Sequence, residues 1–433
     1  MTNKKRFFIF TLGCKINQYE SEAIRESWIS KGFVEVEDVK DADVVIVNSC
    51  AVTEMAVSDV KKYIRRFSRE NPNCEIIVTG CAIPKWENVI KSFENVKYIV
   101  PQKQKAILKD YPELDINNKQ SIEHFSLTIS NYFRARPVVK IQDGCSHYCR
   151  YCIVPLTRGA SVSRDIRDIL DEVKRLLDNG FHELIISGIN LREFKTSYNG
   201  KDIDVWDLVE IISKIMAKDY KGSRIRLSSL DPSLLNNKAL RVLNTCENIA
   251  KHLHLSIQSA DRDILKKMGR AHYTPDHIEQ FIEKLSNIWR LFGLGCDVLV
   301  GFPGESDSNF ENTYEFCKRM PFTYAHVFQY SKRPGTPAAK YPDQVPKQLK
   351  KERSRRLREL FVGKKKEFLK KQLQLNNVSV VVEDRDKLVG MNEYYVICEI
   401  LNGNKGDLKK GDLVKARPVC VDFEKKNLIV SLE

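Results

Sequence analysis

No hydrophobic run in the 433 residues approaches the roughly 20 residues that a membrane-spanning helix requires. The mean hydropathy is −0.37, although 42% of the residues are hydrophobic. This composition argues against a membrane partner. It leaves enough apolar residues for two or three separate domains.

A convincing export signal is also missing. Lys4-Lys5-Arg6 and the apolar stretch Phe7–Leu12 precede Cys14, as in a short lipoprotein signal, but polar residues follow at once. We interpret the stretch as a buried β-strand and keep the signal as the alternative. Twelve cysteines without an export signal predict a cytoplasmic protein whose cysteines bind metal or react, rather than forming disulfides.

Three cysteines lie close together, at Cys145, Cys149 and Cys152, and no fourth cysteine or histidine completes a second pair nearby. A structural zinc site needs four protein ligands. His147 lies between the first two cysteines, where its ring would struggle to reach the same metal ion. Three thiolates can instead hold an iron–sulfur cube and leave one iron open. A zinc knuckle and three buried thiols remain alternatives.

A second set of three cysteines follows three apolar runs in the first 100 residues, at Cys14, Cys50 and Cys81. The alternation of strands and helices there predicts a parallel sheet, in which the carboxyl ends of the strands share one edge. We therefore expect the three thiols to converge, with three buried small hydrophobic residues as the alternative. Cys74 begins the strand that Cys81 ends, about 20 Å away, and is excluded. The expected strands are Phe7–Leu12, Val44–Asn48 and Glu75–Thr79, and the expected helices are Glu20–Lys31 and Ser58–Glu70.

Positive charge is concentrated in one segment. The net charge is +14, and residues 332–371 hold 15 Lys or Arg against 4 Asp or Glu. The pattern predicts a long helix with one apolar face and one basic face. A solvated helix surface is the simpler interpretation, and contact with a phosphate backbone is the functional one. The candidate nucleic-acid contacts are Lys350, Lys351, Arg355, Arg356 and Arg358.

The middle and the end of the chain have different patterns of expected strands, helices and turns. Six strand–helix units from residue 136 predict an open, partial α/β barrel whose site lies at the carboxyl ends of the strands. From about residue 372, short strands and glycine turns predict a small β-barrel of about 60 residues. The expected barrel strands are 136–142, Glu183–Ser187, Arg224–Ser228, His252–Ile257, Cys296–Val300 and Ala325–Gln329, followed by Val378–Val382, Tyr394–Leu401, Asp412–Ala416 and Leu428–Ser431.

Several residues at the strand ends could contact a cofactor. Glycines allow the backbone to approach a ligand closely, and polar side chains can bond a ribose or an amino group. Tyr151 could form an aromatic wall beside an adenine. Core packing is the rival interpretation for each of them. The candidates are Tyr151, Gly188, Asn190, Ser256, Gln258, Val300 and Gly301.

Motifs along the whole chain resemble those of one family. The C-x3-C-x2-C loop with Tyr151 before its last cysteine resembles the cluster loop of radical S-adenosylmethionine (SAM) enzymes. The accompanying segments, in order, resemble the methylthiotransferase family: Arg158-Gly-Ala-Ser-Val-Ser-Arg164, Arg224-Ile-Arg-Leu-Ser-Ser-Leu-Asp-Pro232, His254-Leu-Ser-Ile-Gln-Ser259, Met268-Gly-Arg-Ala-His-Tyr273 and Asp297-Val-Leu-Val-Gly-Phe-Pro-Gly-Glu305.

The resemblance implies an α/β fold of three parts: an N-terminal parallel α/β methylthiotransferase domain (1–125), a central partial (α/β)6 radical SAM barrel that includes the basic helix (131–365), and a small all-β TRAM barrel (371–433). It also implies SAM and two [4Fe–4S] clusters. One cluster, on Cys145, Cys149 and Cys152, would split SAM to a 5′-deoxyadenosyl radical. The other, on Cys14, Cys50 and Cys81, would deliver sulfur, and a second SAM would supply the methyl group.

The implied substrate is a tRNA adenosine beside the anticodon. Cys14-Lys-Ile-Asn17 followed by Glu20-Ser21 looks most like the branch that acts on N6-threonylcarbamoyladenosine. Branches that act on isopentenyladenosine tRNA or on a ribosomal-protein aspartate remain alternatives. A more distant one is a non-catalytic iron–sulfur RNA-binding redox sensor. Implied partners are tRNA, an electron donor such as flavodoxin or ferredoxin, and a sulfur source.

Two features depart from the family pattern. Gly80-Cys-Ala-Ile-Pro84 replaces the usual Gly-Cys-Tyr or Gly-Cys-Leu followed by Ala-Gln. Residues 372–433 hold 9 basic and 10 acidic residues, so the terminal barrel is not an RNA surface by charge alone. We expect it to orient a substrate that the preceding helix attracts.

Overall fold

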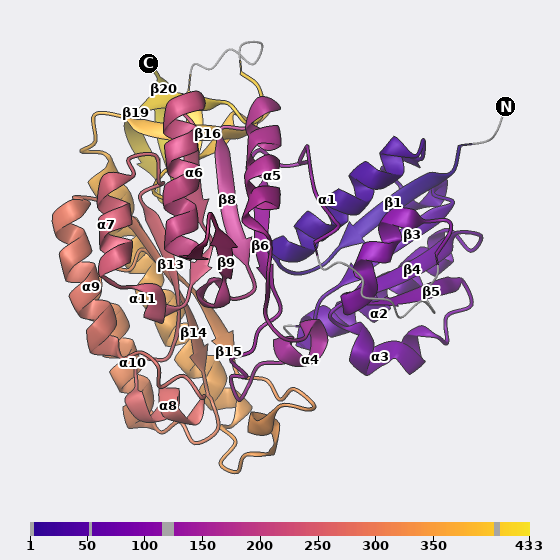
Figure 1. Cartoon of the computed structure of the whole chain (residues 1–433). Coiled ribbons are helices and arrows are strands. Elements are labelled where there is room, and N and C mark those ends of the chain that lie inside the picture. Colours follow the sequence, from indigo (N-terminus) through magenta and orange to yellow (C-terminus); the bar gives the residue numbers. More distant parts are fainter. Residues whose placement is uncertain (1–3, 52–53, 115–124, 402–407) are drawn as a thin grey trace.

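The computed structural model describes residues 4–51, 54–114, 125–401 and 408–433, without the side chains of residues 54–57 and 84–86. It shows the three expected parts (Figure 1): an N-terminal α/β layer, a central array of strands flanked by helices, and a C-terminal β-barrel at the top of the view. Among the described residues, no helix has the length and hydropathy to cross a membrane.

The N-terminal part is a parallel five-stranded sheet in the order β2-β1-β3-β4-β5. Helix α1 begins directly after Cys14, five residues earlier than expected, because Ile16 and Tyr19 already belong to its buried face. The elements are β1 (Arg6–Thr11), α1 (Lys15–Ser30), β2 (Val34–Glu35), β3 (Val44–Ser49), α2 (Glu54–Glu70), β4 (Glu75–Gly80), α3 (Ile83–Ile90), β5 (Val96–Pro101) and a 3-10 segment (Gln102–Asp110).

The central part is an open barrel of six parallel strands. Its two halves, β6-β8-β11 and β13-β14-β15, meet at the bridge between Ile225 and Ile249. Its strands are β6 (Val138–Asp143), β8 (Glu183–Gly188), β11 (Arg224–Leu227), β13 (His252–Gln258), β14 (Gly293–Val300) and β15 (Tyr324–Gln329). Its helices are α4 (Val154–Arg158), α5 (Ile166–Asp178), α6 (Val205–Asp219), α7 (Asn237–Thr245), α8 (Arg262–Lys267), α9 (Pro275–Ile288) and α10 (Asp307–Arg319). Four short strands accompany them: β7 (Val162–Ser163), β9 (Lys195–Tyr198), β10 (Lys201–Asp204) and β12 (Ser229–Leu230).

The C-terminal part is a closed five-stranded barrel with the order β16-β17-β18-β20-β19. The sequence analysis expected four of these strands and missed β17, because that strand has only four residues and contains Gly390. The strands are β16 (Val378–Asp384), β17 (Val389–Asn392), β18 (Ile397–Leu401), β19 (Leu413–Asp422) and β20 (Asn427–Leu432).

The basic segment forms one long helix, α11 (Lys347–Gln372), as expected. Leu357 and Phe361 pack into the core of the central barrel, whereas Phe368 and Leu369 belong to the core of the C-terminal barrel. The helix therefore joins the two barrels and continues past residue 371. The ranges 1–125, 131–365 and 371–433 stay our proposal for the domain limits.

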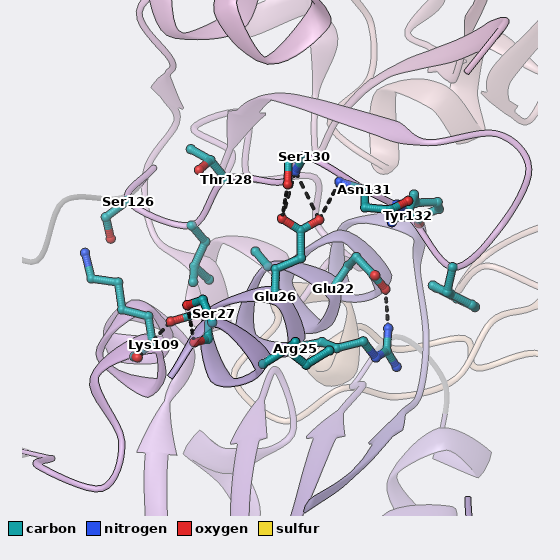
Figure 2. A pocket seen from close by; sticks show the side chains of 15 residues that line it. Glu22, Arg25, Glu26, Ser27, Lys109, Ser126, Thr128, Ser130, Asn131 and Tyr132 are labelled. Atoms are coloured by element: carbon teal, nitrogen blue, oxygen red, sulfur yellow. Dashed lines mark hydrogen bonds and ion pairs between the residues drawn. The ribbon is translucent and has the colours of Figure 1, made fainter. Parts of the chain in front are cut away.

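The connector before the central barrel is fastened to α1 (Figure 2). The Glu26 carboxylate accepts hydrogen bonds from the backbone N–H groups of Ser130 (2.8 Å) and Asn131 (2.5 Å). A surface cavity of about 640 Å³ lies between the helix and the connector. Burial raises the pKa of Glu22 in its wall to about 7. No residue that the sequence predicted for the site lines this cavity, so we assign it no part in the reaction.

Candidate active site

The first cysteine loop follows β6 at the carboxyl edge of the barrel. Gly144 has φ +67°, and a Cβ there would lie 2.0 Å from the carbonyl oxygen of Ala160, so only glycine fits this turn. The N–H of Cys145 donates to Gly159 O (3.0 Å), and the N–H of Cys152 donates to Cys149 O (2.9 Å). These bonds fold the loop back on itself, and its three thiols lie within electrostatic range of one another.

The surroundings of these thiols fit an iron–sulfur cluster. The Arg270 guanidinium lies 3.5 Å from Cys149 Sγ, and the Asn190 side-chain amide lies 3.5 Å from Cys145 Sγ. N–H donors aimed at cluster sulfurs stabilise their negative charge. Burial raises the pKa of Cys152 to about 12, so its thiol ionises readily only when a metal is bound. The residues therefore suit a cation-binding thiolate site.

Arg270 and Asp231 belong to segments quoted for the resemblance, but the sequence analysis gave neither a role. Arg270 Nη2 donates to Asp231 Oδ2 (2.8 Å) and to the carbonyl oxygen of Ser256 (2.9 Å). His272 Nε2 lies 3.0 Å from Asp231 Oδ1. This network fixes the guanidinium beside Cys149. A cation next to a cysteine is a three-dimensional relation, which no local spacing reveals.

Of the cofactor candidates, Tyr151 lies in this loop and Asn190 beside it, whereas Ser256 and Gln258 lie on β13. Tyr151 meets Phe302 edge to face at 6.3 Å. The backbone N–H of Asn190 donates to Gln142 Oε1 (2.8 Å). Gln258 has φ +59° at a bulge of β13. The Ser256 hydroxyl lies 3.4 Å from Asp297 Oδ2, inside the barrel. Their role as SAM contacts stays a prediction.

The protein itself fills the space beside the other three candidates. A Cβ on Gly188 would lie 3.0 Å from the Gln142 side chain, and one on Gly301 would lie 2.4 Å from the stem of Lys350. Val300 is buried in the core. Packing therefore accounts for both glycines without a ligand, and their part in cofactor binding also stays a prediction.

The second set of cysteines lies at the carboxyl edge of the N-terminal sheet. Strands β1, β3 and β4 are neighbours, with Thr11 paired to Asn48 and Ser49 paired to Gly80. Cys14, Cys50 and Cys81 follow these paired ends. A Cβ on Gly13 would lie 2.7 Å from Cys50 Sγ, so the chain beside Cys14 touches Cys50. The three positions are adjacent, and Cys74 lies at the opposite end of β4.

A buried polar junction joins the two cysteine sites. Arg158 ends α4, which follows the first cysteine loop, and its guanidinium donates to Asn17 Oδ1 (2.6 Å), Glu20 Oε1 (3.0 Å) and Asp143 Oδ1 (2.9 Å). Asn17 Nδ2 donates to the carbonyl oxygens of Leu12 (2.8 Å) and Ser49 (2.9 Å). These carbonyls directly precede the Gly13-Cys14 and Cys50 positions. One arginine thus connects both cysteine edges.

The junction holds three cations, Arg158, Lys105 and Lys140, against the carboxylates of Glu20 and Asp143. The Glu20 carboxylate also contacts Lys105 (2.5 Å) and Lys140 (2.9 Å). Burial raises the pKa of Glu20, but the three cations outweigh it and hold the pKa well below its usual range. The Arg158 guanidinium also lies within electrostatic range of Cys81 and Cys14. Positive charge therefore faces the second thiol set, as an anionic cluster would require.

Four of the five candidate RNA-binding residues on the basic helix form hydrogen bonds or ion pairs with other residues of the protein. Lys350 Nζ donates to Tyr330 O (3.0 Å), and Arg358 donates to Val327 O (3.0 Å). Arg355 pairs with Glu359 (2.8 Å) and Arg356 with Glu311 (2.5 Å). Within the described residues, Lys351 is exposed and makes no such bond. Contact of the five residues with RNA stays a prediction. Lys351 is the best suited to it, because its side chain is exposed.

Comparison with known proteins agrees with this geometry. Residues 6–101 match the uncharacterized protein family UPF0004, and residues 139–317 match the radical SAM superfamily. A threonylcarbamoyladenosine tRNA methylthiotransferase (MtaB) of Aquifex aeolicus is 32% identical, covering 86% of this chain and 92% of that protein. The chain belongs to the radical SAM methylthiotransferase family.

Other relatives and one solved structure complete the comparison. The MtaB protein of Rickettsia prowazekii is 31% identical over 95% of this chain and 97% of its own length. A tRNA-2-methylthio-N(6)-dimethylallyladenosine synthase of Clostridium novyi is 32% identical over 89% of this chain and 88% of its own. The radical SAM methyltransferase TsrM of Kitasatospora setae shares the fold, with a TM-score of 0.57, 12% identity and coverage of 78% and 77%.

Family membership settles the class of chemistry. The protein is a radical SAM methylthiotransferase, and the superfamily implies SAM and one [4Fe–4S] cluster. A non-catalytic redox sensor is therefore no longer a competing interpretation. The relatives carry names for two different substrates at nearly equal identity, so the family alone does not choose between them.

Proposed function

We propose that this protein converts N6-threonylcarbamoyladenosine beside the anticodon of tRNA to its 2-methylthio derivative. The observation that carries the proposal is the pair of three-cysteine edges joined through Arg158. One edge would bind the cluster that cleaves SAM, and the other would bind a second [4Fe–4S] cluster as the source of sulfur. A substrate carbon near this junction would be within reach of both.

When bound, the clusters and SAM supply the radical and the sulfur, which no side chain can provide. The chain's own residues do the positioning. Cys145, Cys149 and Cys152 would hold the first cluster, and Arg270 and Asn190 would stabilise the charge on its sulfurs. Cys14, Cys50 and Cys81 would hold the second. The junction around Glu20 excludes water and keeps the two edges in a fixed relation.

The choice of substrate is supported by sequence and by similarity. Cys14-Lys15-Ile-Asn17 followed by Glu20-Ser21 resembles the threonylcarbamoyl branch, and the relatives from Aquifex aeolicus and Rickettsia prowazekii carry that name. Isopentenyladenosine is the second candidate, because the Clostridium novyi relative is equally identical to this chain. A ribosomal-protein aspartate has no comparable support.

Partners follow from the same proposal. Exposed charge on α11 would attract the tRNA backbone in the cytoplasm, with an electron donor such as flavodoxin or ferredoxin and a separate sulfur source. The test is mass spectrometry of tRNA nucleosides from cells with and without the gene. We expect 2-methylthio-threonylcarbamoyladenosine to disappear in the deletion and to return with the wild-type gene. Loss of a 2-methylthio-isopentenyl nucleoside instead would reassign the substrate.

A further inference from the structure

Three neighbouring strands present polar side chains to the interior of the open barrel. Cys296 is fully buried and contacts Cys317 of α10, so it points outward from β14. Successive residues of a strand point to opposite faces, which directs Asp297 inward. Asp297 pairs in register with His326 of β15, and its Oδ1 lies 3.0 Å from His254 Nε2 of β13. Ligand atoms of His254, Asp297 and His326 all lie within 4.8 Å of one another.

The backbone is shaped to hold this group in place. A Cβ on Gly295 would lie 2.3 Å from Tyr324 Cζ and 2.5 Å from His254 Nδ1, so only glycine leaves room for their contact. The Tyr324 hydroxyl lies 2.9 Å from both His254 Nδ1 and His252 Nε2. Burial holds the pKa of His252 well below its usual range, so that ring is neutral. The His254 ring is thereby fixed in orientation behind Asp297.

The C-terminal barrel closes one end of this interior. The Tyr395 ring stacks on His252 at 4.6 Å and on Tyr324 at 5.4 Å. Arg226 lies over the same ring at 5.5 Å and donates to Asn392 O (2.8 Å). Phe328 is the next residue after His326 on the inward face of β15, toward the cysteine end, and is 40% exposed. A ligand would therefore enter from the cysteine end and meet an aromatic face before the polar group.

A lysine of the N-terminal domain lies within electrostatic range of the same interior. Lys15 directly follows Cys14, and its amine lies within electrostatic range of Asp297, Arg136 and Arg226. Both arginines are occupied, because Glu183 pairs with each of them. Lys15 itself makes no hydrogen bond or ion pair with the described residues. Among the residues that the structure describes, Lys15 thus offers this carboxylate and its two imidazoles a nearby amine that no hydrogen bond or ion pair occupies.

This set of groups selects for a polar ligand. An apolar substituent would remove water from Lys15 and Asp297 without replacing its hydrogen bonds, which is costly for buried polar groups. A substituent with a carboxylate and a hydroxyl or amide donor would satisfy both residues. A threonylcarbamoyl group has this chemistry, and an isopentenyl group does not.

We propose that His254, Asp297 and His326, with Lys15 opposite, form the pocket that recognises the threonyl part of the substrate. Lys15 binds its carboxylate, Asp297 accepts from its hydroxyl or amide N–H, and Phe328 stacks on the adenine. The pocket rests on the proposed substrate and adds to it the residues that distinguish threonylcarbamoyladenosine from isopentenyladenosine.

The test compares three anticodon stem-loop RNAs that differ only at the modified adenosine. One carries the threonylcarbamoyl group, one carries its methyl ester, which removes the negative charge, and one carries the isopentenyl group. Reconstituted full-length enzyme is assayed for RNA affinity by fluorescence anisotropy and for methylthiolation. We expect the wild type to bind the free acid about ten- to a hundred-fold more tightly than the ester.

Variants then assign that preference to residues. Lys15→Gln should reduce the acid-to-ester ratio of dissociation constants to near one, and Asp297→Asn and His326→Gln should each weaken binding of the acid several-fold. Iron content and the visible spectrum show whether Lys15→Gln disturbs the neighbouring cysteine. Asp297→Asn and His326→Gln, which lie in the barrel, test the pocket independently. Lys31→Gln, at the other end of α1, is the matched control and should keep the wild-type ratio.

The outcomes separate the pocket from the proposed function. If the wild type modifies the threonylcarbamoyl RNA but binds acid and ester equally, the pocket is wrong and the function stands. A wild-type ratio in Lys15→Gln, together with wild-type affinity for the acid in Asp297→Asn, would also overturn the pocket. If the wild type modifies only the isopentenyl RNA, both proposals fail. Stoichiometric binding of Zn²⁺ that Asp297→Asn abolishes would make the three residues a metal site instead.

Discussion

Cys145, Cys149 and Cys152 come from one loop of eight residues, whereas Cys14, Cys50 and Cys81 come from three strands and span 68 residues. The loop is held by its own backbone, through bonds such as Cys145 N–H to Gly159 O. The other set exists only because β1, β3 and β4 are neighbours in one register. Three thiols are thus brought together by local structure at one site and by tertiary structure at the other.

The comparison also extends to the charges that face the thiols. Arg270 approaches Cys149 from the same barrel that carries the loop. Arg158 approaches the strand-end set from the neighbouring domain, through Asn17 and Glu20. The strand-end site therefore receives part of its positive charge from the neighbouring domain, through Arg158, and part from its own Lys105, whereas Arg270 of the loop site comes from the same barrel. Variants that affect one site and spare the other test this difference.

Replacing the three loop cysteines should have the largest effect on iron content and activity. Replacing Cys145, Cys149 and Cys152 by Ala should lower iron from about eight to about four per chain, since three thiolates of one cluster are lost. SAM cleavage should become undetectable, and methylthiolation should stop with it. Iron analysis and release of 5′-deoxyadenosine measure both. Cys420→Ala, at an exposed cysteine of the C-terminal barrel, is the control. Cleavage that persists in the triple variant would refute this assignment.

The strand-end set should give a narrower defect. Replacing Cys14, Cys50 and Cys81 by Ala should also remove about four irons. SAM cleavage should continue because the loop site is built independently, while transfer of sulfur to RNA should be lost. Chromatography of 5′-deoxyadenosine and of RNA nucleosides from the same reaction separates the two. Loss of cleavage in this variant would show that the sites do not fold independently.

The junction should couple the two sites without belonging to either. Arg158→Gln leaves Glu20 with one fewer cation, and breaking a buried ion pair costs about 3–5 kcal/mol in unfolding free energy. Displaced edges should lower methylthiolation per SAM cleaved by about ten- to a hundred-fold. Denaturant unfolding and the ratio of the two products measure these effects. Arg167→Gln, an exposed arginine on α5, should change neither quantity.

The same junction predicts a pH dependence of stability. The pKa of Glu20 is lowered in the folded protein, so its carboxylate stabilises the fold above its ordinary value of 4.5. That contribution is lost as the pH falls through the lowered pKa. In Arg158→Gln the folded-state pKa of Glu20 should lie closer to its ordinary value, so the loss of stability in acid should be smaller and should be complete at a higher pH than in the wild type, which unfolding at stepped pH values would reveal.

The sequence was a good guide where spacing and periodicity carry the information. The cysteine loop, the three strands that end in cysteines and the long helix α11 all follow from local patterns. Arg158, Asp297 and Lys15 were not recognised as partners, because their meaning depends on which domain each side chain enters. Gly301 depends on tertiary structure in the same way: the space beside this glycine holds the side chain of Lys350, about 50 residues further along the chain, and its part in cofactor binding stays a prediction.

A smaller effect is expected on the basic helix. Lys351 is exposed, whereas Lys350 is bonded to Tyr330 O, so Lys351→Ala should weaken tRNA binding more than Lys350→Ala. Loss of one phosphate contact should lower the slope of log affinity against log salt by about one. Anisotropy titrations at several salt concentrations give the slope. Lys218→Ala on α6 serves as the control, and an unchanged slope in Lys351→Ala would leave α11 as a solvated surface.

The smallest effect is expected at Cys74, which the sequence analysis excludes from the strand-end set because it precedes β4 instead of following it. It is buried, and its Sγ lies 3.9 Å from the Asn95 amide. Cys74→Ala should therefore cost only about 1 kcal/mol in unfolding free energy. Iron content and methylthiolation should stay at wild-type values, in contrast to Cys81→Ala at the other end of the strand. Loss of four irons from Cys74→Ala would show that position in the sheet does not decide which cysteines hold the second cluster.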